Sequence, residues 1–343
     1  MPATLPQLQK HGAYFQLDRA RYDAASRHYT SACLAAGLKR LGIPVYANFS
    51  DELFAVAPPG AEGPLLNLFP ITEENNSPQL TQEIWASAAP NKCILSHADT
   101  VSTIFTPPGV PSLMAHETRF RRIVHGARLP WAFGLSDRIM AATAAPVPFD
   151  QRQPIILRNF RPSRSQHIRN MLDWTLVPHL EKHFAVDRAI SPDHQLKLGQ
   201  FLGCLAYGGS WEEDLSPNPA LAAQPHYHTY RQELVFHRPV AILRWDSWRW
   251  WESLAAGCLT FNLDFEKYGL LLPVMPEAWK HYVPIDLSDP KATIERLRDE
   301  RARWPEVAAN GRVWARTHYS PDAVAARLVD YVSPTEAPEK NTR

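Results

Sequence analysis

The stretch that decides the fold covers residues 240–283 and reads VAILRWDSWRWWESLAAGCLTFNLDFEKYGLLLPVMPEAWKHYV. Residues 240–243 form a short apolar run, which predicts a buried strand. Residues 246–256 follow with the apolar period of a helix. Gly257 ends that helix in a left-handed cap, and 259–263 reads as the next strand. A strand, a helix and a strand in direct succession indicate a unit of a parallel α/β sheet.

The turn into this helix holds candidate anion-binding residues. Either Asp246 or Ser247 caps the helix, and Arg249 and Glu252 share one of its sides, near the N-terminus and beyond the carboxyl end of the strand. A helix N-terminus suits a phosphate, and a guanidinium can grip a diphosphate through two hydrogen bonds. Glu252 could accept hydrogen bonds from ribose hydroxyls. From these residues alone, however, an i,i+3 pair on a solvated face is favoured over a binding site.

The rest of the chain repeats this alternation. A helical period over 28–42 ends at Gly42 and leads into an apolar strand over 43–48. Short apolar segments predict further strands at 93–97, 112–117, 131–134, 154–159 and 201–209. Helices are predicted at 166–180, 226–236, 290–304 and 321–332, with a helical turn and short strand from 137 to 142. At roughly 100–200 residues per domain, 343 residues suggest two domains, joined by the proline-rich stretch 146–153.

Composition narrows the class of protein. Apolar residues make up 45% and charged residues 21%, which is ordinary globular usage. A formal charge of +1 offers no field for a polyanion, so no nucleic-acid partner is expected. The four cysteines are far apart in apolar or small-residue runs, which favours buried thiols over disulfides or a zinc site. Without a signal sequence or an apolar run of roughly 20 residues, we expect a cytoplasmic protein with at most peripheral membrane contact.

One motif carries a family resemblance. S-x-R-x-x-E-x-L-A-A-G-C is followed by a strand, by P-x-x-W-x-x-Y and by V-P-I-D-L-S-D-P. It resembles the donor-binding half of exostosin-like and related GT-B glycosyltransferases, over about residues 195–332. The matching positions are Ser247, Arg249, Glu252, Gly257, Pro276, Trp279 and Tyr282. The runs H-T-Y-R-Q-E-L at 228–234 and W-A-R-T-H-Y-S at 314–320 fit the same pattern.

The resemblance implies an α/β fold with two Rossmann-like domains facing across a cleft, the GT-B arrangement. Residues 1–150 are then an acceptor domain and 151–320 a donor-nucleotide domain, with a helix at 321–333 returning to the first domain and a flexible tail at 334–343. The implied activity is transfer of a sugar from a nucleotide-diphosphate sugar to an acceptor hydroxyl, in bacterial-type glycan or glycoconjugate synthesis. A glycan, a lipid-linked group or a protein would be the acceptor.

One departure from the family pattern bears on the mechanism. Many retaining members carry two glutamates eight positions apart around this helix, whereas Arg244 stands eight positions before Glu252. This favours an inverting reaction. The enzyme must then stabilise the leaving diphosphate and deprotonate the acceptor hydroxyl. Arginines and helix N-termini do the former without a metal, and the chain has no DxD motif, so no metal or other cofactor is expected.

Further donor-binding candidates follow two strands of the second half. In the resembling proteins the loop after the first of these strands reaches the donor phosphates; a role in solvating the start of the next helix is equally compatible. Glycines at the end of the second strand would let backbone approach a nucleotide, or would form a plain turn. The candidates are Arg158, Asn159, Gln166, Arg169, Tyr207 and Gly208.

The general base is expected in the first domain, where a histidine or a carboxylate suits the task near neutral pH. Two predicted strand ends each carry a histidine with an acid, namely His97 with Asp99 and His116 with Glu117. The second pair is slightly preferred. Two other functions remain open: a nucleotide-sugar epimerase, and a non-catalytic GT-B relative that binds a glycan or a partner.

Overall fold

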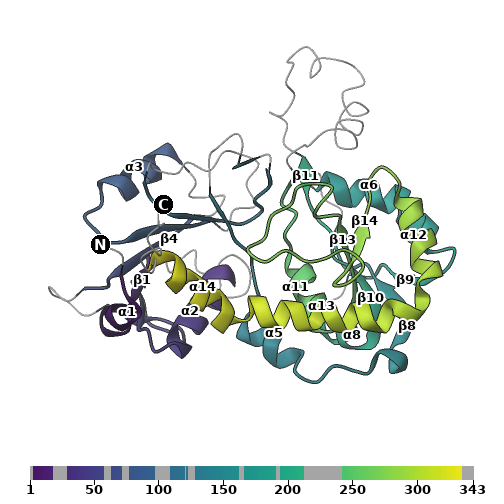
Figure 1. Cartoon of the computed structure of the whole chain (residues 1–343), viewed down its shortest axis with the longest axis horizontal. Helices are drawn as coiled ribbons and strands as arrows, with labels where there is room; N and C mark the ends of the chain where they lie inside the picture. The colour runs from purple at the N-terminus through teal and green to yellow at the C-terminus, as the bar shows by residue number, and fades with distance from the viewer. Residues whose placement is uncertain are drawn as a thin grey trace, which may run out of the picture.

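The chain folds into two α/β domains, each built on a parallel sheet, in the computed structural model (Figure 1). The structure describes residues 3–17, 29–57, 63–71, 77–96, 109–119, 121–122, 128–161, 166–190, 194–211 and 242–333. The predicted α/β class with two Rossmann-like domains is confirmed. The helix expected at 226–236, which includes the family-like run 228–234, and the tail at 334–343 lie outside these residues.

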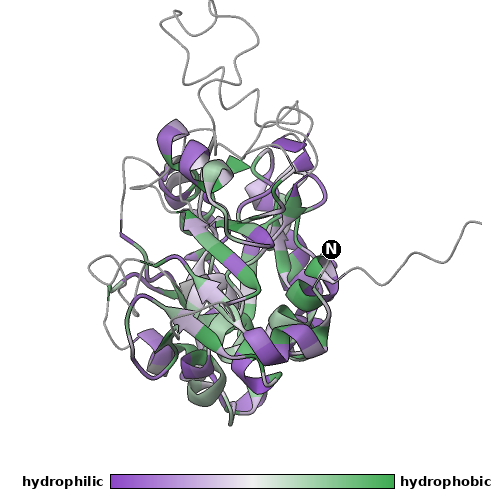
Figure 2. Ribbon diagram, turned by 90° about the vertical axis from the view of Figure 1, so that its left-hand side faces the viewer, coloured by the Kyte–Doolittle hydropathy of each residue, from purple (hydrophilic) through white to green (hydrophobic). Residues whose placement is uncertain are grey.

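The first domain contains a seven-stranded sheet in the order β3-β2-β1-β4-β5-β6-β7, with every pair parallel. All residues of β4 are buried, as expected for a strand covered on both faces. Figure 2 shows hydrophobic residues along the strands and hydrophilic ones mainly on the surrounding helices. The strands are β1 (Ala13–Phe15), β2 (Val45–Ala47), β3 (Ala55–Val56), β4 (Leu66–Ile71), β5 (Lys92–Ser96), β6 (Ser112–Met114) and β7 (Leu129–Pro130).

The second domain contains a five-stranded parallel sheet in the order β14-β13-β10-β8-β9. The central strand β10 lies between β8 and β13 and is buried along its whole length. Strand order departs from chain order beside β10, so ligands are expected beyond its carboxyl end. The strands are β8 (Gln153–Leu157), β9 (Ala185–Asp187), β10 (Phe201–Leu205), β13 (Leu259–Leu263) and β14 (Val283–Ile285).

Helices flank both sheets. Those of the first half are α1 (Leu5–His11), α2 (Tyr29–Arg40), α3 (Pro78–Ala86) and α5 (Asp137–Ala142). Those of the second half are η1 (Phe149–Gln151), α6 (His167–Thr175), α7 (Val177–Leu180), α8 (His194–Gln200), α11 (Trp248–Ala255), α12 (Pro290–Asp299), η3 (Arg301–Arg303), α13 (Trp304–Tyr319) and α14 (Pro321–Val332).

Three predicted elements need correction. The apolar run before α11 is not a strand of the parallel sheet: β12 (Ile242–Leu243) pairs antiparallel with β11 (Ser210–Trp211) in a separate two-stranded sheet. The strand expected at 131–134 is β7, two residues earlier, and 131–136 has no regular structure. The segment 304–319 forms the long helix α13, which the sequence reading left unassigned.

The end of the chain returns to the first domain. Helix α13 runs along the second domain, and α14 then packs beside α2 (Figure 1). Their contact is so close that a Cβ on Gly37 would lie 1.9 Å from the carbonyl oxygen of Pro321. Arg40 of α2 also forms ion pairs with Asp137 and with Asp322, the latter at 3.0 Å. These contacts tie α2, α5 and α14 together.

A second connection joins the domains directly. After β6 the chain reaches the second domain, where Thr118 and Leu270 form an isolated antiparallel bridge. The N–H of Arg119 donates to the carbonyl of Gly269 at 2.8 Å, and that of Leu271 donates to the carbonyl of Glu117 at 3.0 Å. This segment therefore belongs to the junction between the domains.

Candidate functional site

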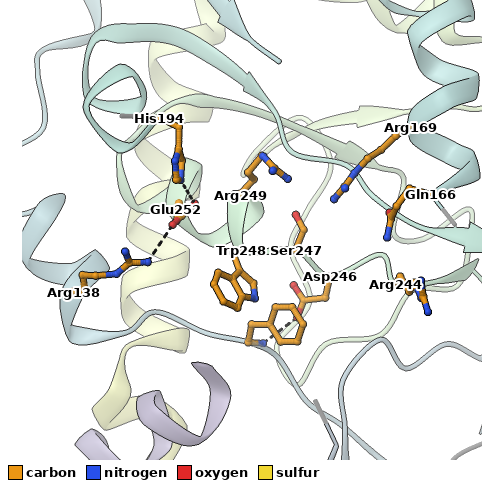
Figure 3. Close-up of a pocket in the computed structure, with 11 residues that line it drawn as sticks. Arg138, Gln166, Arg169, His194, Arg244, Asp246, Ser247, Trp248, Arg249 and Glu252 are labelled. Atoms are coloured by element: carbon orange, nitrogen blue, oxygen red, sulfur yellow. Dashed lines mark hydrogen bonds and ion pairs between the residues drawn. The ribbon is translucent and has the colours of Figure 1, made fainter. Parts of the chain in front are cut away.

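A cavity lies beside the N-terminal end of α11, where the segment after β7 and helix α5 meet the second domain (Figure 3). Its volume is about 430 Å³, within the range of roughly 300–1,000 Å³ that is typical of small-molecule sites. The lining residues come from the segment after β7, from the beginnings of α5, α6 and α8, and from the stretch 244–252 that leads into α11. The lining residues are Phe133, Arg138, Gln166, Arg169, His194, Arg244, Asp246, Ser247, Trp248, Arg249 and Glu252.

Helix α11 aims its N-terminus at this cavity. Ser247 is the N-cap: its Oγ accepts from the N–H of Trp250 at 3.4 Å and donates to the carbonyl of Ala206 at 2.8 Å. The second bond fixes the cap to the chain that leaves β10. Gly257 ends the helix with φ 72°, as predicted. The helix is buried from Trp250 to Ala255, so it is a rigid support for the groups it carries.

The other end of α11 is capped by two arginines. The carbonyl of Ala256 accepts from Nη2 of Arg152 at 2.5 Å, and the carbonyl of Ala255 accepts from Nε of Arg312 at 3.1 Å. These cations complement the negative end of the helix. The positive end is left facing the cavity, where it favours an anion.

Arg249 extends this anion-binding end. Its Nε donates to the carbonyl of Asn159, and its guanidinium lies 5.8 Å from the centre of the Phe160 ring. The pKa of Arg249 lies below its usual value because burial, with Arg158 nearby, outweighs the raising effect of Cys204 and Glu252. The side chain is thus held by one nitrogen, and its Nη groups face the cavity among the described residues (Figure 3). That arrangement suits a bidentate grip on a phosphate.

Glu252 lies one turn further along α11 and is only 4% exposed. Its Oε2 accepts from Nε2 of His194 at 3.1 Å, and its Oε1 accepts from Nε2 of Gln195 at 3.1 Å. Burial raises the pKa of Glu252, but these two hydrogen bonds and the charges of His194 and Arg138 outweigh it, so the pKa lies below its usual value. Glu252 is therefore an ionised, fixed acceptor, not half of a solvated i,i+3 pair.

The opposite end of the cavity is formed by Gln166, Arg169 and Arg244 (Figure 3). The N–H of Gly209 donates to Oε1 of Gln166 at 2.8 Å, and Nε of Arg169 donates to the carbonyl of Tyr207 at 3.4 Å. A Cβ on Gly208 would lie 3.1 Å from Nη2 of Arg169, so the missing side chain makes room for that guanidinium. Four arginines, Arg138, Arg169, Arg244 and Arg249, outnumber the two carboxylates that line the cavity, so its net charge is positive.

Asp246 links the cavity to the rest of the molecule. Its Oδ1 accepts from Nε1 of Trp251 at 2.7 Å, and its Oδ2 accepts from the N–H of Phe133 at 3.0 Å. Its own N–H donates to Nδ1 of His116 at 3.0 Å. The carboxylate, which stands just before the N-cap, thus ties Phe133 in the segment after β7 to Trp251 in α11.

The predicted donor-binding residues divide into two groups. Gln166, Arg169, Ser247, Arg249 and Glu252 line the cavity. The others stand behind it. Arg158 forms a buried ion pair with Asp173 and donates to the carbonyl of Phe160 at 2.7 Å. Asn159 contributes its carbonyl to Arg249, Tyr207 packs its ring on Phe160, and Gly208 contributes space.

Of the two predicted catalytic pairs, the structure describes only His116 with Glu117. His116 is 1% exposed, adopts φ 56° and packs edge-on against Phe133 and Trp245. Glu117 is also 1% exposed, and its Oε1 accepts from the N–H of Thr118 at 3.0 Å. Neither lines the cavity, so this structure assigns the pair a place in the domain junction. His97 and Asp99 follow Ser96, the end of β5, and lie outside the described residues.

Several cavity residues were not singled out from the sequence. Arg138 comes from α5, His194 begins α8, and Arg244 sits in a left-handed conformation (φ 56°) between β12 and α11. A non-glycine residue in that conformation is strained by roughly 1–3 kcal/mol, and such strain clusters at functional sites. Of these three residues, only Arg244 could have been found from the sequence, because it stands eight positions before Glu252, where many retaining GT-B enzymes carry a glutamate.

Two negative findings concern the described part of the chain. It contains no group of three or more histidine, cysteine, aspartate or glutamate side chains arranged to hold a metal ion. None of its helices combines the length and apolar character needed to cross a bilayer. The four cysteines are all buried as thiols, as expected, and burial raises the pKa of Cys93 to about 12.

Comparison with known proteins finds a likeness among solved structures and none among family models or curated sequences. No family model matches the chain, and no curated protein matches its sequence. Among solved structures it is similar to Anabaena HepE, determined in complex with UDP and glucose. The likeness covers 95% of this chain and 100% of the other, with 9% sequence identity and a TM-score of 0.48. Function therefore has to be inferred from the chain's own residues.

Proposed function

We propose that this protein is a glycosyltransferase that takes a sugar from a nucleotide-diphosphate sugar bound in the cavity at the N-terminus of α11. The observation that carries the proposal is the position of Arg249 beside that N-terminus, in a cavity with three further arginines. A diphosphate matches this environment, because it accepts hydrogen bonds from guanidinium and backbone N–H groups and carries the opposite charge.

Transfer, and not binding alone, is favoured by the site's position between two domains. A donor held in the second domain leaves the facing domain to present an acceptor hydroxyl of a glycan, a lipid-linked group or a protein. The arginines stabilise the departing diphosphate electrostatically, so the proposed reaction needs no metal. Arg244 in place of a second glutamate supports an inverting course, within bacterial-type glycan or glycoconjugate synthesis. His97 with Asp99 and His116 with Glu117 stay the candidate bases.

Nucleotide binding is the first test. The melting temperature of the full chain is measured with UDP, GDP, CDP and dTDP, followed by calorimetry with any that stabilise it. Arg249→Met should weaken binding about 10-fold or more, because a charge-assisted hydrogen bond contributes about 1.5–3 kcal/mol. Arg298→Met, which removes an exposed arginine on α12, is the matched control and should leave the affinity unchanged.

The same assay separates the alternative functions. If no nucleotide stabilises the protein, a non-catalytic glycan- or partner-binding role replaces the proposal. If a nucleotide binds, sugar-nucleotides are incubated with the protein alone and with candidate acceptors. An altered sugar-nucleotide formed without acceptor would identify an epimerase, whereas release of nucleotide with a new glycosidic product establishes transfer.

A further inference from the structure

Trp248 is the tryptophan of α11 that faces the cavity. The neighbouring indoles of Trp245, Trp250 and Trp251 are fully buried in the core of the second domain. Trp248, by contrast, is half-buried and forms part of the cavity wall beside the N-cap (Figure 3). A large aromatic ring on the wall of a cavity that otherwise carries charged groups suits a ligand with an apolar face.

The indole of Trp248 is supported by Phe133, which comes from the segment after β7. The two rings meet edge to face, with centroids 6.5 Å apart and planes at 85°. Phe133 is itself fixed, because its N–H donates to Oδ2 of Asp246 at 3.0 Å and its ring packs edge to face against His116. A ring supported in this way has little rotamer freedom left to lose when a ligand stacks on it, which favours binding.

The first turn of α11 places Trp248 relative to the other binding groups. Trp248 is the first residue of the helix, directly after Ser247, so it stands at the end where the diphosphate is proposed to bind. Glu252, which is expected on the nucleoside side, is four residues further on and lies on the same side of the helix, about one turn away. Trp248 thus lies on the side of the diphosphate that points away from the nucleoside.

The covalent order of a sugar-nucleotide identifies the ring that reaches Trp248. In such a molecule the ribose and the base follow one phosphate, and the transferred sugar is bonded directly to the other. A hexopyranose presents a face of C–H groups, which can pack on an aromatic ring while the hydroxyl groups stay at its rim. The ring next to Trp248 is therefore the sugar and not the base.

We propose that the hexopyranose of the donor stacks on the indole of Trp248, so that this residue contributes to the binding of nucleotide-hexoses but not of the nucleoside diphosphate alone. This inference rests on the proposed nucleotide-sugar function. It adds a substrate class, hexopyranosyl nucleotides, and a residue that reads the sugar. The anion-binding groups do not supply that selectivity, since they make the same contacts with both ligands.

The experiment measures dissociation constants by calorimetry on the full chain, without acceptor, for UDP with UDP-glucose, GDP with GDP-mannose, CDP with CDP-glucose and dTDP with dTDP-glucose. For the pair that binds, Trp248→Leu should weaken the sugar conjugate about 5-fold or more and the diphosphate less than about 2-fold, because only the stacked ring loses its contact. Trp248→Tyr keeps an aromatic face and should stay within about 2-fold of wild type for both ligands. Trp174→Leu, which removes an indole on α6 that is 84% exposed, is the control and should change neither affinity.

The outcomes keep the two proposals apart. If Trp248→Leu weakens the diphosphate and its sugar conjugate equally, or weakens neither, the sugar does not stack on Trp248, while the diphosphate site stands. An equal loss of conjugate affinity in the leucine and tyrosine variants would mean that the packing of the indole matters and not an aromatic face, which also overturns the inference. A wild type that binds a diphosphate but none of the four conjugates would exclude a hexose at this position. Absence of any nucleotide binding would remove the proposed function and the inference together.

Discussion

The N–H of Asp246 donates to Nδ1 of His116 at 3.0 Å, across the junction between the two domains. Asp246 lies next to the N-cap of α11, and His116 follows the last strand residues of β6. The predicted catalytic histidine thus supports the loop that forms the cavity. Its imidazole accepts through Nδ1, which leaves the proton of the neutral ring on Nε2.

This geometry gives different expectations for two substitutions of His116. Asparagine tolerates the left-handed conformation and places an oxygen near the position of Nδ1, so His116→Asn should keep the hydrogen bond. His116→Ala leaves the buried N–H of Asp246 without its acceptor and should cost about 1–3 kcal/mol in the free energy of unfolding. Urea titration of both variants measures the difference.

The turnover numbers of His116→Asn and His116→Ala test the prediction that His116 is the general base. If His116 is the general base, both variants lose about 10²-fold or more in turnover, with nucleotide affinity kept in His116→Asn. If it is structural, His116→Asn stays active and only His116→Ala is impaired, in nucleotide affinity as well as stability.

Glu117 should make stability depend on pH in an unusual direction. Burial raises its pKa, more than the N–H of Thr118 and the charges of Arg121 and Arg128 lower it. The folded state then binds a proton more tightly than the unfolded chain, so the contribution of Glu117 becomes unfavourable as pH rises above the unfolded value of about 4.3. Glu117→Gln, which stays neutral, should raise the melting temperature at pH 8 and leave it unchanged near pH 4.

The opposite result would carry its own meaning. If Glu117→Gln melts at a lower temperature than wild type at pH 8 but at the same temperature at pH 4, the ionised carboxylate is stabilised by the arginines. A variant that is more stable at pH 8 but inactive would place Glu117 in the chemistry.

Gly208→Ala tests the cationic end of the cavity. The added Cβ would lie 3.1 Å from Nη2 of Arg169 and 3.2 Å from the carbonyl of Arg244, so the guanidinium has to move. We expect nucleotide affinity to fall several-fold, with a loss of about 1–3 kcal/mol in the free energy of unfolding. Gly199→Ala in α8 is the control, because nothing lies within 4 Å of its Cβ position, and it should be neutral or stabilising. Equal affinities of both variants would place Arg169 outside the binding site.

Arg152→Met tests the other end of α11. Arg152 donates to Sγ of Cys258 and to four carbonyls that would lose a donor, those of Val147, Leu198, Phe201 and Ala256. The free energy of unfolding should fall by about 3 kcal/mol, because buried carbonyls stay behind without partners. Nucleotide affinity of the folded fraction, measured at low temperature, should change little. A loss below about 0.5 kcal/mol, comparable to that of Arg298→Met, would mean that water replaces the guanidinium.

Local signals in the sequence were sufficient for α11 and the strand after it. A cap at Asp246 or Ser247, the left-handed Gly257 and the strand that follows come from short-range rules; the structure confirms the last two and places the cap at Ser247. Helix α13 was not predicted: the sequence analysis ends a helix at Trp304 and interprets only 314–320, its last turns, as part of the family pattern. β12 was placed in the wrong sheet because strand pairing is a non-local choice that its two residues do not encode.

The sequence by itself determined the α/β class and the placement of Arg249 and Glu252 on one turn of a capped helix, because a helix sets the spacing of its own residues. Only the tertiary structure decided which residues surround that turn. Arg138, Arg169 and His194 come from three separate helices, and His116 and Glu117 went to the domain junction instead of the cavity. Distances between such residues depend on how sheets and helices pack, and packing is a property of the whole chain.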